Sequence, residues 1–180
     1  MRIALLWGLL SCAVALAAVA DERLPKMEMI DCATAPLASS FPDDAPSCFY
    51  NLETTERGGK IDHYTMLATH DPYFAVVGRS VARQGTTIKL ATIQQMKEIE
   101  LADQRLPRDK VLEWFEPGQD GDLQFIGYRK SDVICYDFLR GLERFGPGYK
   151  STIGGEICKV RGESFPVGDF KALAAHFSQR

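Results

Sequence analysis

Alternating apolar and polar residues predict a pair of β-strands in the first half of the chain. The stretches Ile61–Ala68 and Tyr73–Val81 are rich in β-branched and aromatic residues. The segment His70-Asp71-Pro72 lies between them and is typical of a compact turn. Gly58-Gly59 marks a turn before the first strand, and Gln84-Gly85 ends the second.

The second half of the chain predicts three more strands, near Leu123–Tyr128, Asp132–Phe138 and Thr152–Val160. Arg129-Lys130-Ser131 joins the first two as a hairpin, and a loop that includes Gly141 leads to the third. Successive side chains of a strand point to opposite faces. The residues therefore separate into two sets, with Ile134, Tyr136 and Phe138 on one face and Val133, Cys135 and Asp137 on the other.

Three segments have the character of helices. Apolar residues recur every third position after Lys89, among good helix formers that extend toward Gln104. A short helix is expected over Arg108–Phe115, with Pro107 in its first turn. The apolar stripe from Val167 to Phe177 predicts a last amphipathic helix. We therefore expect one compact α+β domain, mainly antiparallel sheet with two to three packed helices, stapled by disulfides.

The N-terminus has the pattern of a secretory signal peptide. One positive charge at Arg2 precedes an apolar run from Ile3 to Val19, and Ala18-Val19-Ala20 offers a small-x-small cleavage site. Cleavage after Ala20 would place the mature chain in the periplasm or outside the cell. A lipoprotein signal ending at Cys12 is the alternative, but the apolar run continues beyond that cysteine. The run is also shorter than the roughly 20 residues of a membrane-spanning helix, so no membrane span is expected after cleavage.

Residues 21–47 are expected to form an extended arm, and residues 48–180 a single domain. Four prolines are spread through the arm, and proline disfavours both helices and central strands. The four cysteines of the mature chain predict two disulfides in an oxidising compartment. Local pairing, Cys32 with Cys48 and Cys135 with Cys158, is the simplest of the three possible connectivities.

The charge of the chain excludes general nucleic-acid binding. Without Arg2 the mature chain has 20 Lys and Arg residues against 24 Asp and Glu residues, a net charge of −4. Proteins that displace phosphate counterions need an excess of positive charge. The single asparagine, Asn51, is followed by Leu52-Glu53, so there is no glycosylation sequon.

No sequence motif of the chain indicates a particular reaction, cofactor or metal. Ser80 follows Gly78-Arg79 but lacks the closing glycine of a nucleophile elbow. No C-x-x-C occurs, and four exported cysteines pair evenly. His63 and His70, with Asp71 beside the latter, are the candidates for acid/base catalysis. Their spacing of seven residues places them on opposite faces of an ideal strand, and structural roles explain both histidines.

Positive charge gathers in one part of the chain. Residues 129–161 hold seven basic against four acidic residues. With interleaved aromatic residues, they predict a binding surface formed by Arg129, Lys130, Arg140, Arg144, Tyr149, Lys150 and Arg161. A sheet edge protected by lysine and arginine is the structural alternative. We therefore expect an exported, non-enzymatic binding domain for a protein or a small anionic ligand. A small exported hydrolase that uses His63 or His70 with a neighbouring carboxylate is the alternative.

Overall fold

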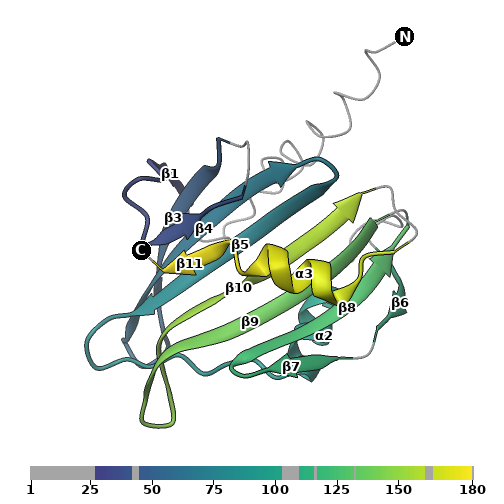
Figure 1. The fold of residues 1–180 in the computed structure, drawn as a ribbon. Coiled ribbons are helices and arrows are strands. Elements are labelled where there is room, and N and C mark those ends of the chain that lie inside the picture. The colour runs from purple at the N-terminus through teal and green to yellow at the C-terminus, as the bar shows by residue number, and fades with distance from the viewer. Residues whose placement is uncertain are drawn as a thin grey trace.

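A nine-stranded antiparallel sheet forms the body of the protein (Figure 1). The computed structural model describes residues 27–41, 45–102, 110–115, 117–131, 133–160 and 164–179. The predicted signal peptide over residues 1–20 and the candidate residue Arg161 lie outside this part of the chain.

The strands run in the order β1-β3-β4-β5-β10-β9-β8-β6, and β7 also pairs with β8. A separate two-stranded sheet pairs β2 with β11. The two helices of the described residues are α2 (Ile93–Ala102) and α3 (Val167–Ala174). The strands are β1 (Glu28–Ile30), β2 (Leu37–Ser39), β3 (Ser47–Thr54), β4 (Lys60–His70), β5 (Tyr73–Ala82), β6 (Val111–Trp114), β7 (Gly118–Asp120), β8 (Leu123–Lys130), β9 (Val133–Phe145), β10 (Gly148–Val160) and β11 (Phe177–Gln179).

The larger hydrophobic core lies between the sheet and α3. We call this side of the sheet the α3 face; in Figure 1 it points toward the viewer, with α3 and β11 in front of the long strands. Phe170 of α3 and Phe177 of β11 are both buried against it. The strands contribute alternate residues to the same core, among them Met66, Val77, Phe125, Tyr136, Phe138, Ile153 and Ile157.

The opposite side, which we call the α2 face, lies behind the sheet in Figure 1 and carries α2. Cys135 and Cys158 face each other across β9 and β10 there, and with Tyr128 they form a second, smaller buried cluster. The predicted separation of the β9 side chains onto two faces is confirmed. Tyr136 and Phe138 lie in the main core, whereas Cys135 lies in the smaller cluster on the α2 face. Within the described residues, no helix combines the length and apolar character needed to cross a membrane.

The expected α+β class with two to three packed helices is wrong. Among the described residues 58% lie in strands and 12% in helices, so the protein is mostly antiparallel β-sheet. The helix expected over Arg108–Phe115 is one part of the difference, because Val111–Trp114 forms strand β6. Strand β3 and the longer β9 and β10 add more. This strand pairs with β8, and Trp114 packs on Tyr128 with 5.3 Å between the ring centroids. Pairing at a sheet edge therefore overrides the local helical pattern.

Two other elements end in different places from those the sequence predicts. The last helix ends at Ala174 rather than Phe177, since Phe177 begins β11 and pairs with Ser39 of β2. Gly141 lies within β9 instead of a loop: the Tyr149 ring covers it so closely that a Cβ atom there would lie 2.2 Å from Cε1 of that ring. The turn comes later, at Gly146, whose φ of 57° suits glycine.

Both predicted disulfides are present. Cys32 bonds to Cys48 and Cys135 to Cys158. The first bridge links the segment between β1 and β2 to β3, a strand that the sequence analysis did not predict. Nearby, Ala35, Leu37 and Phe41 reach into the main core.

Removing the first bridge tests how strongly it holds this segment. The loop between Cys32 and Cys48 spans 16 residues, and closing a loop of this length is worth about 3 kcal/mol in the unfolded chain. We expect the double variant Cys32→Ser/Cys48→Ser to lose about 3 kcal/mol of unfolding free energy in urea. Equal stability of the oxidised wild type and the variant would contradict this role.

Candidate functional site

A groove on the α2 face is the candidate functional site. It has a volume of about 480 Å³ and lies between α2 and strands β5, β10 and β9. Small residues of the strands form its floor, and α2 forms one wall with Met96, Ile99 and Glu100. Its lining is Val76, Gly78, Ser80, Ala91, Met96, Ile99, Glu100, Asp137, Phe138, Leu139, Thr152, Gly154, Gly155 and Glu156.

The strand register explains why small and polar residues meet in this groove. Gly78 of β5 pairs with Gly154 of β10, so two neighbouring positions of the floor lack side chains. Two residues from this glycine pair toward one end of the groove, Ser80 of β5 pairs with Thr152 of β10. Two residues from Gly154 toward the other end, Glu156 of β10 pairs with Asp137 of β9. Polar groups thus lie at both ends of a glycine floor.

Three carboxyl groups meet at one end of the groove. Asp137 and Glu156 are direct cross-strand partners, an arrangement that like charges normally disfavour. Glu100 joins them from α2, and carboxyl oxygens of the three residues all lie within 4.8 Å of one another. We call Glu100, Asp137 and Glu156 the carboxylate cluster.

The buried Tyr128 hydroxyl bonds to both strand carboxyl groups. It donates to Glu156, and it lies 3.3 Å from Oδ1 of Asp137. A hydroxyl has one proton, so it can donate to one carboxylate at a time, and Asp137 can complete the network by keeping its own proton. Burial, with the nearby charges of Glu100 and Glu156, raises the pKa of Asp137 to about 8. Burial and the same acidic neighbours raise the pKa of Tyr128 as well.

Lys130 supplies the positive charge of this network. Its Nζ donates to Oε2 of Glu100 at 2.6 Å and lies 4.9 Å from the centre of the Tyr128 ring. Burial alone would lower the pKa of Lys130, but the hydrogen bond to Glu100 and the negative charges of Glu156 and Glu100 outweigh it and raise this pKa. Three carboxyl groups therefore share one ammonium group, and this end of the groove is acidic.

The carboxylate cluster has the oxygen ligands that hard divalent cations prefer. The Lys130 ammonium, however, already neutralises part of its charge. Cys135, Cys158 and Glu156 also lie close enough together to resemble a metal site. Their sulfur atoms are joined in a disulfide, so they are not thiolate ligands.

Ser80, at the other end of the groove, belongs to a hydrogen-bonded row of three residues. Its Oγ lies 2.8 Å from Nδ1 of His63, and Nε2 of the same ring lies 2.7 Å from Oε2 of Glu53. His63 is the direct cross-strand partner of Ser80. Glu53 lies diagonally across from His63, because β3 pairs Asn51 with His63.

The other predicted catalytic candidates do not join this row. His70 lies on the opposite face from His63, as their spacing predicts, and its ring packs edge-on against Phe41 at 5.8 Å. Asp71 lies in the turn after β4 and precedes a cis peptide bond to Pro72.

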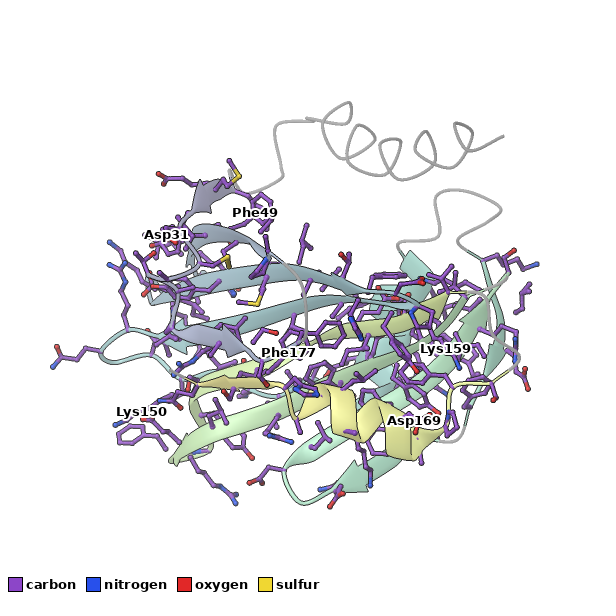
Figure 2. The ribbon with its side chains drawn as sticks, turned by 45° about the horizontal axis from the view of Figure 1, so that its top comes forward. Asp31, Phe49, Lys150, Lys159, Asp169 and Phe177 are labelled. Atoms are coloured by element: carbon purple, nitrogen blue, oxygen red, sulfur yellow. A yellow bond between two sulfur atoms is a disulfide. The ribbon has the colours of Figure 1, made fainter. Side chains whose placement is uncertain are left out.

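The structure does not gather the predicted basic surface in one place. Lys130 pairs with Val133, and Arg144 lies eleven residues further along β9, so these positions are roughly 36 Å apart at about 3.3 Å per residue. Figure 2 shows the separation on β10, with Lys150 at one end and Lys159 at the other. The predicted residues thus divide into two groups. Arg144, Tyr149 and Lys150 lie near the β9–β10 turn, where Tyr149 pairs with Arg144, and Arg140 lies four residues along β9 beside Ile153. Arg129 and Lys130 lie toward the other end, with Arg129 3.6 Å from Glu113.

Sequence analysis missed the carboxylate cluster. The pattern placed Asp137 on the same face as Cys135, which is correct, but it gave no partner for this carboxyl group. The sequence does contain a signal for this contact. Asp137 lies two positions after Cys135, and Glu156 lies two positions before Cys158. An antiparallel pair bridged by those cysteines must bring the two acids together.

Comparison with family models, with curated proteins and with solved structures found no match for this chain. The candidate site therefore stands on its geometry alone.

Proposed function

We propose that the protein is an exported binding domain that takes a small amphipathic ligand with a positively charged end group in the groove on the α2 face. The observation that carries the proposal is an apolar groove that ends in three carboxyl groups, of which only Glu100 is paired with the Lys130 ammonium. Pockets for small molecules are typically apolar, with a few polar groups that fix the orientation of the ligand.

The two ends of such a ligand match different parts of the groove. Val76, Met96 and Ile99 offer apolar contact, and burial of an alkyl chain against them contributes roughly 0.8 kcal/mol for each CH₂ group. A cationic head meets the carboxylate cluster, where opposite charges attract. The cluster also disfavours a negatively charged head.

This proposal replaces the anionic ligand expected from sequence, because the basic residues on which that expectation rested are divided between the two ends of the long strands. Export is part of the proposal. The two disulfides suit an oxidising compartment, and the signal-peptide pattern with cleavage after Ala20 supplies the route.

A matched pair of ligands tests the preference for charge. Octylammonium and octanoate have the same alkyl length and opposite charges at pH 7. By isothermal titration calorimetry we expect octylammonium to bind at least about tenfold more tightly, a difference of about 1.4 kcal/mol. Glu156→Gln is expected to remove most of this preference.

Asp122→Asn is the control, because Asp122 is an exposed acid in the turn before β8, outside the groove lining. It changes the net charge as Glu156→Gln does, and it should retain the preference. Equal binding of the two ligands, or no binding of either, would contradict the proposal. Tighter binding of octanoate would favour the small anionic ligand that the sequence predicts.

A further inference from the structure

We propose that Ser80, His63 and Glu53 form an acyl-transfer site at the opposite end of the groove from the carboxylate cluster. Ser80 is the nucleophile, His63 the general base and Glu53 the residue that positions His63. This inference does not depend on the charge of the ligand that the groove binds, since it rests on a separate set of side chains.

Hydrogen bonding fixes the roles of the two ring nitrogens. The Glu53 carboxylate is an acceptor only, so the His63 Nε2–H donates to Oε2 across 2.7 Å. In the neutral ring Nδ1 is then the unprotonated nitrogen, and it accepts a hydrogen bond from the Ser80 hydroxyl across 2.8 Å. A hydroxyl bonded to a base that a third group orients is the general arrangement of an activated nucleophile. The ring nitrogens are exchanged relative to the usual serine triad, but a hydroxyl proton can pass to either one.

The surroundings of Ser80 leave room for an ester. Ser80 lines the groove beside Gly78 and Gly154, which have no side chains, so an acyl group can lie over them toward Val76. Thr152 lies on the other side of Ser80 from His63 in the same cross-strand row. Thr152 also lines the groove, and in the proposed site its hydroxyl is the candidate donor to the developing oxyanion.

The reaction has two balanced steps. Ser80 Oγ adds to the ester carbonyl carbon and its proton moves to His63 Nδ1; the bond from carbon to the alcohol oxygen then breaks, and the alcohol leaves with that proton. In the second step His63 takes a proton from water, whose oxygen adds to the acyl carbon. The carboxylic acid leaves as the proton returns to Ser80 Oγ. The net change is ester plus water to acid plus alcohol.

The protein contains a matched control for this chemistry. Ser40 Oγ also lies 2.8 Å from Nδ1 of a histidine, His176. Within the described part of the chain His176 has no hydrogen bond to a carboxylate. Ser40 is therefore bonded to a histidine that no carboxylate of the described residues orients, whereas Ser80 is bonded to a histidine that Glu53 orients.

Reaction with p-nitrophenyl acetate tests the proposal. We expect release of p-nitrophenolate and an acetyl group that peptide mass spectrometry locates on Ser80 and not on Ser40. Ser80→Ala should abolish this acetylation, and His63→Gln should slow it by at least about 100-fold, the lower range for a general base. Glu53→Gln should also slow it, and Glu53→Asp should restore part of the rate, which a merely structural role would not do.

Ser40→Ala should leave the release of p-nitrophenolate unchanged. Acetylation that is confined to lysines, that is equal at Ser40 and Ser80, or that is unaffected by His63→Gln would overturn the proposal. The location of the acetyl group in the wild-type protein decides the question even if a variant does not fold. Failure of this test leaves the octylammonium result untouched, because the two experiments use opposite ends of the groove.

Discussion

Raising the pH from about 4 to about 8 is expected to destabilise the protein, and Asp137→Asn is expected to remove most of that loss. The pKa of Asp137 rises from 3.8 to about 8 on folding, because burial and the charges of Glu100 and Glu156 disfavour its ionised form. Below pH 4 both the folded and the unfolded chain hold this proton. Between about 4 and 8 the unfolded chain releases it while the folded protein keeps it, so the free energy of unfolding falls as the pH rises.

One pKa unit corresponds to about 1.4 kcal/mol, and Asp137 is in partial contact with the water of the groove. We therefore expect a loss of about 3–5 kcal/mol over this range. The amide that Asp137→Asn introduces is neutral at every pH and similar in shape to the protonated acid. The measurement is urea unfolding at pH 4 and pH 8.5 for the wild type and Asp137→Asn, followed by circular dichroism.

Two features separate this effect from other titrations. The hydrogen bond from Arg83 lowers the pKa of Asp62, so the stability that this pair contributes is lost only as the pH falls below about 4, outside the tested window. Asp122→Asn, at an exposed turn, should keep the slope of the wild type. Parallel profiles for the wild type and Asp137→Asn would show that Asp137 is not protonated in the folded protein.

Local patterns identified most of the sheet because they record which face of a strand is buried. The pleat of one strand predicts that Ile134, Tyr136 and Phe138 lie on one face and Cys135 and Asp137 on the other. The structure shows this alternation. The Cys135–Cys158 disulfide was predictable for a related reason, since cysteines on matching faces of neighbouring strands can pair. The Cys32–Cys48 disulfide was predicted from its short separation in sequence. The faces of a strand and the two disulfides can be predicted because each depends on residues close in sequence or on the pairing of two neighbouring strands.

The errors fall where a partner distant in sequence decides the structure. Val111–Trp114 resembles a short helix in isolation, yet it forms strand β6 because β8 offers a free edge and Tyr128 a ring on which Trp114 packs. Gly141 resembles a loop residue until the Tyr149 ring is placed over it. Local propensity does not contain these contacts.

The candidate site is harder to predict for the same reason. Glu100, Asp137 and Glu156 come from three elements, so their carboxyl groups meet only once α2 covers the strands. His63 was a candidate from sequence with a neighbouring carboxylate, but the chain could not reveal that Glu53 and Ser80 lie on either side of its ring. The basic residues that are close in sequence are likewise divided between the two ends of long strands.

Phe170→Ala is expected to cost about 3–5 kcal/mol of unfolding free energy, the usual range for a buried phenylalanine. The Phe170 side chain is fully buried and stacks on Tyr136 with 4.5 Å between ring centroids. An α-helix as short as the 8 residues of α3 is marginal in water without tertiary contacts. Loss of this ring should therefore also release α3 from the sheet and speed hydrogen exchange in α3 and β11.

Val167→Ala provides the comparison within the same helix. Val167 is 43% exposed, and such surface substitutions usually change stability by less than about 0.5 kcal/mol. Urea unfolding and hydrogen exchange of both variants separate the effect of the buried ring from that of helix propensity. If Phe170→Ala cost no more than Val167→Ala, the main core would have to be held by strand residues alone, and α3 would only cover it. The fully buried ring between α3 and three aromatic side chains of β8 and β9, Phe125, Tyr136 and Phe138, argues for the larger loss.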